Sequence, residues 1–488
     1  MEQRAMSIGR RLAPRVTVIT VVAAITLASI GVTADTMPAR VTSGTVLQTN
    51  LVSDLAGVAA IGDPNLVNPW GISESSGSPF WISDNGAGAA TLYRVPPIST
   101  VALVVTIPTP HSLTGCTPTG TVFNTGLANR AFTITGQAAS APAVFLFATE
   151  DGTIAGWNPG IDPVEFSGPP GTSAVIAVDN SGNNFTNPDP TQQTGAVYKG
   201  LAIETSSTPV IAADPDSTAL LYASNFRSGT IDVYDAKFSN VTTLPSGAFR
   251  DPALPKGYAP FNVQVLNGKV YVDYALQDAT RHDPLAGRHH GFVDVFNLDG
   301  TPGLPGGAMR LISRGALDSP WGLAIAPQGF AGLGGASTAP VLLVGNFGDG
   351  LIHAFDAMTG TPFGQLADPD GEPIKIDGLW ALKVGNGGAG GSANTVYFSA
   401  GLFRESHGLF GSLAAVAPGS PEGPAEAQWL QANTDVVQHD QQRLASDSTS
   451  GAPLATIRQD IRTLDEDSHR LADVQRAFED DSIDDATN

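Results

Sequence analysis

The chain has 488 residues, of which 42% are hydrophobic and only 15% are charged, and it contains 55 glycines and 36 prolines. This composition is typical of a turn-rich, well-buried β protein and excludes a coiled coil, a collagen and an intrinsically disordered chain. The formal net charge of −21 argues against nucleic acid as a partner, and the single cysteine, Cys116, excludes an intrachain disulfide framework.

Residues 1–34 carry the pattern of an export signal. Arginines that include Arg10 and Arg11 precede an uncharged, mostly apolar stretch at 16–34, and small residues stand directly before Asp35. This order predicts a secretory signal peptide over 1–34 and a secreted or periplasmic location for the mature protein. The alternative is an uncleaved membrane anchor, because the stretch is nearly long enough to span a bilayer. We expect the protein to contact a membrane only if this segment stays uncleaved.

A repeat organises residues 45–416. Each copy has a short apolar strand, a gap, a second strand, a polar turn with glycine and a third strand. The clearest copies begin with PWGIS at Pro69, KGLAIE at Lys199 and PWGLAIA at Pro320. One marker residue can be chosen in each copy, and the steps between markers are 50, 80, 61, 60 and 59 residues. The markers are Trp70, Gly120, Gly200, Phe261, Trp321 and Trp380.

The repeat predicts an all-β fold, a six-bladed β-propeller with four-stranded blades. One small sheet cannot bury its alternating apolar residues alone, whereas six sheets packed face to face in a ring bury both faces of each. The strand-like segment 46–52 precedes the first copy, and we expect it to pair with the last blade and close the ring. Units near 60 residues are too long for the coils of a β-helix and too regular for a sandwich.

Several motifs of the repeat also occur together in a known family. In chain order they include DPNLVNPWGIS, FWISDNGAG, VYKGLAI, YASNFRSGTIDVYD, SPWGLAIAP and ESHGLFG. With these motifs the chain resembles an uncharacterised family of exported bacterial proteins related to NHL-repeat propellers, over roughly residues 50–413. The resemblance implies a signal-bearing, six-bladed propeller. It implies no activity and no functional residues.

The composition changes after the repeat. Residues 417–451 are rich in Ala, Pro, Gly, Ser and Gln, which predicts a linker. Residues 452–488 are acidic, and apolar residues that include Leu454, Ile457 and Ile461 recur at three- and four-residue steps, as on one face of a helix. This tail is either a docking helix for a partner or a partly disordered acidic segment.

In a propeller, the loops before the first strands and between the second and third strands open on one face. Their side chains therefore meet at one mouth, where amides and aromatic rings suit a neutral polar ligand such as a sugar, a lactone or a peptide. The alternative is structural, since Asn and Asp cap turns and Trp fills cores. The candidates before first strands are Asn68, Trp70, Asn262, Trp321, Asp377 and Trp380. Those in the hairpin turns are Asp84, Asn85, Glu150, Asp151, Asn225, Arg227, Asn346, Asp349, Glu405 and His407.

The fourth unit has an enlarged hairpin at 277–290 that holds three of the eight histidines. Asp and His at these spacings can ligate a divalent metal, but two arginines in the same loop would repel a cation. The metal candidates are Asp278, His282, Asp283 and His290. Weaker calcium-like patterns occur at 179–184 and 368–372, where turn formation is the alternative.

Two hypotheses of function follow. The sequence has no G-x-S-x-G nucleophile motif, and GNGGAG at 385–390 lies between two predicted strands rather than before a helix. The preferred hypothesis is therefore a binding propeller whose mouth takes a small polar ligand or an extracellular protein. The alternative is a metal-dependent hydrolase or lactonase in which Asn68, Asn262 and Asp377 help to hold Ca²⁺ or Zn²⁺ at the axis.

Overall fold

The computed structural model describes residues 44–182, 195–335 and 337–417, together with five single residues between 441 and 468. The predicted signal peptide at 1–34 lies outside the described residues. The linker and the acidic tail also lie outside them, apart from Ala417 and those five residues. Within the described part of the chain, no helix is both long and apolar enough to cross a membrane.

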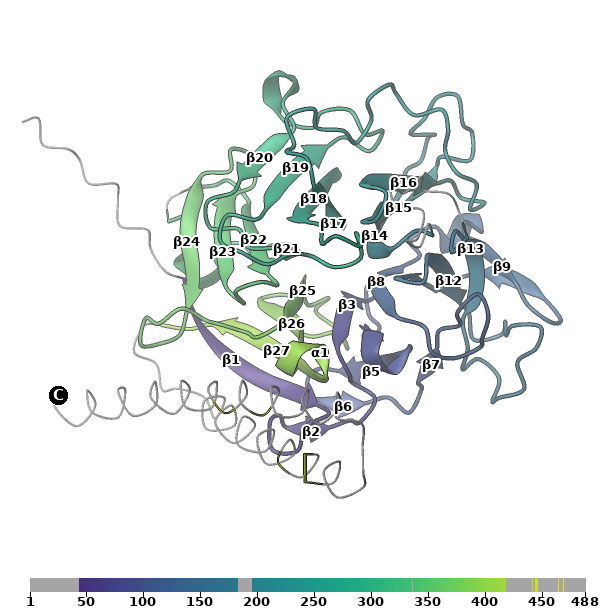
Figure 1. The fold of residues 1–488 in the computed structure, drawn as a ribbon, viewed down its shortest axis with the longest axis horizontal. Coiled ribbons are helices and arrows are strands. Elements are labelled where there is room, and N and C mark those ends of the chain that lie inside the picture. Colours follow the sequence, from purple (N-terminus) through teal and green to yellow (C-terminus); the bar gives the residue numbers. More distant parts are fainter. Residues whose placement is uncertain are drawn as a thin grey trace, which may run out of the picture. The chain divides into compact units, whose positions relative to one another are not determined.

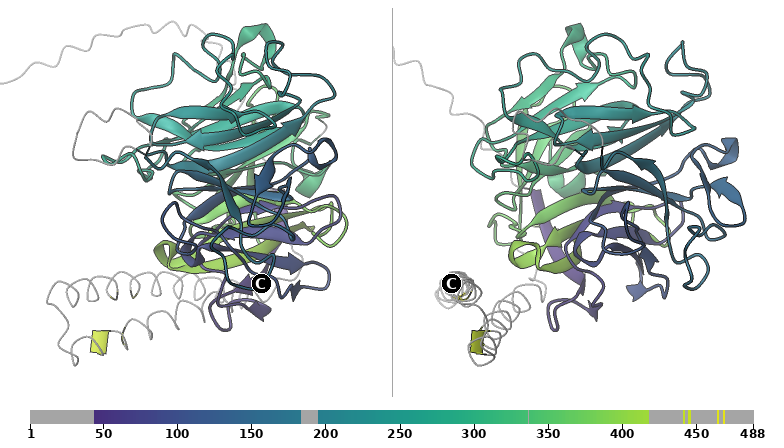
Figure 2. Two further views of the ribbon diagram at one scale, coloured as in Figure 1. Left: turned by 90° about the vertical axis from the view of Figure 1, so that its right-hand side faces the viewer. Right: turned by 45° about the vertical axis from the view of Figure 1, so that its right-hand side comes forward.

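The described residues form an all-β structure with several sheets arranged around a common centre (Figure 1). Figure 2 shows the same sheets from two further directions, packed face to face. The helical elements in this part of the chain are all short. They are α1 (Leu402–Glu405) and the 3₁₀ turns Asn85–Ala87, Leu127–Asn129, Pro305–Gly307 and Phe330–Gly332.

We divide the strands of the repeat into units 1 to 6, numbered after the six copies in the sequence. Unit 1 holds β3 (Pro69–Ser73), β4 (Phe80–Asp84), β5 (Ala89–Arg94), β6 (Ser99–Thr100) and β7 (Val105–Thr106). Unit 2 holds β8 (Pro118–Phe123), β11 (Phe145–Thr149), β12 (Thr153–Trp157) and β13 (Val175–Asp179). Unit 3 holds β14 (Tyr198–Thr205), β15 (Ala219–Asn225) and β16 (Thr230–Tyr234).

The second half of the chain continues in the same way. Unit 4 holds β17 (Tyr258–Leu266), β18 (Lys269–Leu276), β19 (Phe292–Phe296) and β20 (Arg310–Ser313). Unit 5 holds β21 (Pro320–Ile325), β22 (Val341–Asn346), β23 (Ile352–Asp356) and β24 (Pro362–Ala367). Unit 6 holds β25 (Leu379–Val384), β26 (Thr395–Gly401), β27 (His407–Ala415) and, from the other end of the chain, β1 (Gly44–Ser53).

The first strands of the units surround the centre. Among the described strands, contacts run from β3 through β8, β14, β17, β21 and β25 and back to β3 (Figure 1). The arrangement is therefore propeller-like, and it brings to one axis residues that lie up to about three hundred positions apart, such as Trp70 and Trp380.

Strand β1 completes unit 6, which is the pairing that the sequence analysis predicts for 46–52. It runs antiparallel to β27, with Val46 opposite Ala415 and Ser53 opposite Leu409. The short strand β2 (Ile61–Gly62) pairs with its end. At its start, β1 also pairs in parallel with β24, which joins units 5 and 6 into one nine-stranded sheet.

Among the described residues, the prediction of four strands in every unit is wrong for unit 1, which has five strands, and for unit 3, which has three. After β16 the chain enters a segment with prolines at 245, 252 and 255. Proline has no N–H to donate to a strand ladder, so a fourth strand is disfavoured there. Unit 2 departs in the other direction, because a separate hairpin of β9 (Thr133–Thr135) and β10 (Ser140–Pro142) is inserted before β11. This insertion contributes to the long second step of the repeat.

Bulges in the first strands determine which side chains point toward the central axis. The pairing with the second strand shifts register around Trp70, Lys199, Phe261, Trp321 and Trp380, so each of these residues lies in a bulge. A bulge twists the strand and re-aims a side chain. These five residues therefore occupy equivalent positions in five of the units.

Candidate functional site

Three tryptophans close the centre of the ring. Trp70 stacks on Trp380 with 3.5 Å between ring centroids, and Trp321 meets both rings edge-on at 6.0 and 5.7 Å. Each is at most 2% exposed. Below them a cavity of about 10 Å³ is lined in part by Thr121 and Asn262, which leaves room for a single water at most. These predicted ligand-binding tryptophans thus lie in the core and form the floor of the site.

Lys199 occupies the bulge position that holds Trp70, Phe261, Trp321 or Trp380 in other units. Its side chain is fully buried, and its ammonium nitrogen lies 5.0 Å from the centroid of the Trp70 ring. This distance is within the range of a cation–π interaction. A lysine is almost never buried to this degree unless its charge is paired.

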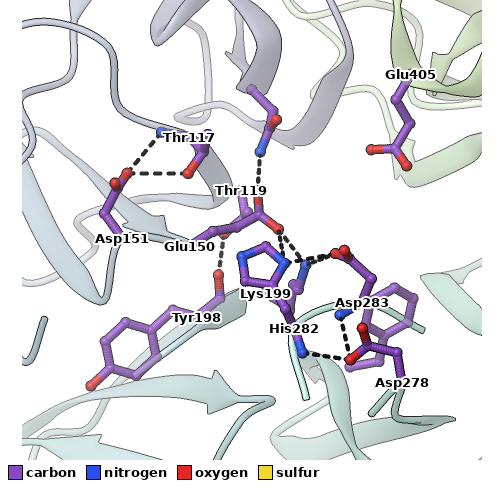
Figure 3. A network of polar contacts seen from close by, with 12 residues as sticks. Thr117, Thr119, Glu150, Asp151, Tyr198, Lys199, Asp278, His282, Asp283 and Glu405 are labelled. Atoms are coloured by element: carbon purple, nitrogen blue, oxygen red, sulfur yellow. Dashed lines mark hydrogen bonds and ion pairs between the residues drawn. The ribbon is translucent and has the colours of Figure 1, made fainter. Parts of the chain in front are cut away.

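Two carboxylates pair with Lys199 (Figure 3). Glu150, from the turn after β11 in unit 2, forms an ion pair with its ammonium group through Oε1. Asp283, from the enlarged hairpin of unit 4, contacts the same group at 3.2 Å. The Glu150 side chain is only 10% exposed, whereas that of Asp283 is 63% exposed. The ion pairs of Lys199 thus connect units 2, 3 and 4 next to the ring of Trp70.

Two asparagines continue this network toward unit 6. Asn85 donates to Glu150 Oε2 at 2.9 Å, and Asn68 donates to Asn85 Oδ1 at 3.3 Å and to Glu405 Oε2 at 2.9 Å. The indole N–H of Trp380 donates in turn to Asn68 Oδ1 at 3.1 Å. We call the connected side chains of Asn68, Asn85, Glu150, Lys199, Asp283 and Glu405 the polar network.

The hydrogen bond between Asn68 and Glu405 connects units 1 and 6, and the backbone is strained at both residues. Asn68 has φ 46° and Glu405 has φ 69°, both in the left-handed region that favours glycine. Such conformations cost roughly 1–3 kcal/mol for other residues and cluster at functional sites. The two strained residues are hydrogen-bonded to each other, which places the strain directly at the polar network.

Burial and neighbouring charges act in opposite directions on these groups. Burial lowers the pKa of Lys199, but the carboxylates of Glu150, Asp283 and Glu405 outweigh it, so the pKa lies above its ordinary value. The lysine is therefore a charged ammonium near neutral pH and not a free amine nucleophile. Burial raises the pKa of Glu405, and the charges of Glu150 and Asp283 raise it further.

The enlarged hairpin of unit 4 reaches over this network (Figure 3). Asp278 Oδ1 accepts the backbone N–H of His282 at 2.9 Å, and His282 Nδ1 lies 2.8 Å from Asp283 Oδ1. Of the predicted metal candidates, these three lie together, whereas His290 contacts the carbonyl of Leu285 at 3.0 Å.

A group of possible metal ligands does form here, with one member from outside the hairpin. Ligand atoms of Glu150, His282 and Asp283 all lie within 4.8 Å of one another. The ammonium of Lys199 contacts both carboxylates, however, and so already supplies a positive charge at this point.

The remaining candidates from the hairpin turns bond mainly within their own surroundings. Asn225 donates to Asp232 at 3.0 Å, and Asn346 donates to Asp349 at 3.0 Å and to the carbonyl of Ala316. Asp84 is fully buried at the end of β4, and burial raises its pKa well above the ordinary value. The contacts of Asn225 and Asn346 are those of turn residues, and the burial of Asp84 is that of a core residue.

Three more candidates lie apart from the polar network. Asn262 donates to the backbone carbonyl of Trp321 at 2.6 Å, below the floor. Asp377 Oδ2 accepts the N–H of Phe403 at 3.1 Å, and His407 Nδ1 lies 2.7 Å from Asp54. In the weaker calcium-like patterns, Asp179 and Asp368 accept N–H groups of their own turns. Residues 183 and 184 lie outside the described residues.

A side pocket of about 580 Å³ adjoins the polar network. Glu150 and His282 belong to its wall, and so do Asp151 and Arg227 from the turns of units 2 and 3. Asp151 Oδ2 accepts both the N–H and the hydroxyl of Thr117, at 3.0 and 3.1 Å. The other lining residues are Thr117, Ser181, Gly195 and Ala196.

Lys199 is the residue of the site that the sequence candidates omit. The signal was present in the repeat, because KGLAI at Lys199 aligns with PWGLAI, where Trp321 stands in place of the lysine. A charged residue at an aromatic position of a repeat indicates a local departure from the common core. In this copy the marker residue of the repeat is Gly200, which follows the lysine.

Comparison with known proteins gives relatives by sequence. No family model matches the chain. It is 30% identical over 369 residues to uncharacterized protein R648 of Acanthamoeba polyphaga mimivirus, covering 74% of this chain and 78% of that protein. The chain belongs to the family of this viral protein. A second mimivirus relative, uncharacterized protein L690, is 29% identical, with 74% and 84% of the two chains covered. Since both are viral, the expected relation to exported bacterial proteins stays a prediction.

Solved structures with similar folds are distant. An α-L-arabinanase of Penicillium chrysogenum is 12% identical, with a TM-score of 0.42 and coverage of 76% of this chain and 98% of that one. The virginiamycin B lyase of Staphylococcus aureus is 11% identical, with a TM-score of 0.37 and coverage of 76% and 99%. Similarity at this level carries no argument about activity.

Proposed function

We propose that the protein is an exported six-bladed β-propeller that binds a small polar ligand at the mouth formed by the polar network and the side pocket. The observation that carries this proposal is the convergence of polar side chains from units 1, 2, 3, 4 and 6 on one point above an aromatic floor. A propeller offers this geometry because its turns on one face surround a single axis.

The ion pair of Lys199 and Glu150 supports a functional role. Desolvating two charges costs several kcal/mol per ion, and well-packed apolar residues often replace such pairs without loss of stability. Four other units fill the position of Lys199 with a buried aromatic residue, so the fold accommodates an apolar side chain there. The charges are therefore poorly explained by stability alone.

The size of the side pocket favours a small molecule over a protein partner. Its volume of about 580 Å³ lies within the usual range for small-molecule sites, roughly 300–1,000 Å³. The exported location rests on residues 1–34, whose basic start and apolar stretch match a signal peptide.

A thermal-shift screen of the purified full chain against sugars, sugar lactones and amino acids tests the proposal. We expect at least one compound to raise Tm, and we expect the double variant Lys199→Met/Glu150→Leu to abolish that shift. Lys237→Met is the matched control, since Lys237 forms an exposed ion pair with Asp216. A screen without any shift, or a shift that the double variant retains, contradicts the proposal.

The metal-dependent hydrolase is the second candidate, and the grouping of Glu150, His282 and Asp283 favours it. Elemental analysis and calorimetric titration with Ca²⁺ and Zn²⁺ distinguish the two functions. If the ammonium of Lys199 replaces a metal, the wild-type protein binds neither ion tightly. Stoichiometric metal that is lost in Glu150→Gln and His282→Ala would establish the hydrolase candidate instead.

A further inference from the structure

Arg227 introduces a positive charge into the wall of the side pocket. It lies in the turn between β15 and β16, within the motif NFRSG, which aligns with NFGDG in unit 5. The equivalent residue there is Gly348, so the turn itself does not require an arginine. The arginine therefore adds a charge that the turn itself does not need.

The guanidinium of Arg227 is held in place but not satisfied. The residue is 5% exposed, and its Nη1 donates to the carbonyl of Gly195 at 2.8 Å. Gln277 fixes the same turn from unit 4 by donating to the carbonyl of Phe226 at 2.5 Å. Among the described residues, the buried Nε of Arg227 has no hydrogen-bond partner. A buried donor without an acceptor costs roughly 1–3 kcal/mol, so an acceptor from a ligand would be stabilising.

Neighbouring acids do not use this donor. Burial lowers the pKa of Arg227 below its ordinary value, and the nearby carboxylates of Asp278 and Asp283 offset only part of this effect. Their own contacts run to the backbone of the hairpin, to His282 and to Lys199. Arginine presents its N–H groups as a planar fork that matches a carboxylate in a two-point interaction.

Other residues of the pocket wall offer acceptors. Asp151 has one carboxylate oxygen engaged by Thr117, and Glu150 stands beside it in the same turn. An acidic wall repels a second carboxylate and accepts hydrogen bonds from hydroxyl or ammonium groups. The pocket thus presents a positive group and a negative wall to one small ligand.

We propose that the side pocket binds a small organic acid whose carboxylate contacts Arg227 and whose other end donates hydrogen bonds to the wall of Glu150 and Asp151. This inference rests on the proposed function, since it names the chemical class of ligand for the same mouth. The donors at the far end are hydroxyl groups, as in a sugar acid, or an ammonium group, as in an amino acid.

Four probes separate these features when each is titrated into the full chain and followed by calorimetry. Glucuronate carries a carboxylate and hydroxyls, γ-aminobutyrate a carboxylate and an ammonium, butyrate only a carboxylate, and glucose only hydroxyls. We expect glucuronate or γ-aminobutyrate to bind at least tenfold more tightly than butyrate and glucose. We expect Arg227→Met to weaken that binding at least tenfold and Arg227→Lys to weaken it less. Arg250→Met, at an exposed arginine, is the control and leaves binding unchanged.

Each other outcome overturns the inference. If glucose binds as tightly as glucuronate and Arg227→Met has no effect, the inference fails while the proposed mouth remains. If butyrate binds as tightly as the two bifunctional acids, the acidic wall plays no part. If no probe binds, the assigned ligand class is wrong. Far-ultraviolet circular dichroism and urea unfolding of each variant show whether a loss of binding reflects a loss of fold.

Discussion

Two residues of the polar network are charged side chains at positions where other copies of the repeat have aromatic ones. Lys199 replaces an aromatic residue of the floor. Glu150 takes a turn position that Phe226 and Phe347 hold in units 3 and 5. The two exceptions come from neighbouring units and contact each other. The aromatic core therefore contains a buried ion pair, and removal of either partner alone would leave the other charge buried and unpaired.

Removing one partner should cost more than removing both. Lys199→Met leaves the buried carboxylate of Glu150 without its cation, and we expect a loss of about 3–5 kcal/mol in the free energy of unfolding. Lys199→Met/Glu150→Leu removes both charges and should recover most of that loss. Urea unfolding at pH 7 measures the difference. A double variant that is as unstable as the single one would show that the pair itself stabilises the fold.

Sequence patterns identify part of this site. Asn68, Asn85, Glu150 and Glu405 stand in loops that a propeller brings to one mouth, and the structure connects them by hydrogen bonds. The burial of the tryptophans could not be decided in advance, because it depends on stacking between rings from units 1, 5 and 6. The contact of Lys199 with Glu150 depends in the same way on which side chains the bulges direct to the axis.

At the level of elements, the first strands pack with their backbones in close approach. A Cβ added to Gly71 would lie 2.6 Å from the carbonyl oxygen of Thr119 in the next unit. Gly322 shows the same closeness to the carbonyl of Trp380, at 2.8 Å. Real side chains do not tolerate such distances to backbone atoms. The glycines that follow the bulge residues are therefore required by the spacing of neighbouring units.

Gly120→Ala tests this spacing. The new methyl group would collide with the backbone nitrogen of Leu201 in unit 3, where no flexible side chain can move aside. We expect a loss of about 2–3 kcal/mol in the free energy of unfolding, as for overpacked cores. Gly77→Ala is the control, since nothing lies within 4 Å of its added Cβ, and it should change stability by less than about 0.5 kcal/mol. Equal unfolding midpoints for the two variants would refute the requirement for glycine at 120.

The strands differ in how well the sequence predicts them. The first, second and third strands of each unit carry the repeated motifs, and the structure places strands in all of these segments. Most fourth strands carry no such signal, and some are only two residues long, whereas the closing strand β1 is predicted from segment 46–52. A fourth strand forms where the third strand has an unpaired edge and the segment that follows can donate hydrogen bonds to it. Prolines in that segment disfavour the pairing.

For the whole molecule, the notable electrostatic feature is the number of buried carboxylates. Burial raises the pKa of Asp84 and of Asp273 well above the ordinary value. Burial also raises the pKa of Asp294 to about 6, although the Arg310 guanidinium donates to its Oδ1 at 2.6 Å and opposes the rise. Each of these groups binds its proton more tightly in the folded state than in the unfolded chain.

The protein should therefore be more stable in mild acid than at neutral pH. A carboxyl with a raised pKa contributes most below its ordinary pKa, and the contribution is lost as the pH rises through the folded value. For Asp294 the change from 3.8 to about 6 corresponds to roughly 3 kcal/mol, lost between about pH 4 and pH 7. We expect Tm to fall over this interval, and Asp294→Asn to make the fall shallower. A Tm that rises from pH 5 to pH 7 would contradict the prediction.

The pairing of β1 with β27 also determines how the fold responds to force. Val46 lies opposite Ala415, and the N–H of Val416 donates to the carbonyl of Thr45 at 3.2 Å, so the start of β1 and the end of β27 lie side by side. Tension applied through the flanking segments would load the terminal hydrogen bond first and then peel the two strands apart one bond at a time. The ring would open at a much lower force than a sheet pulled in shear.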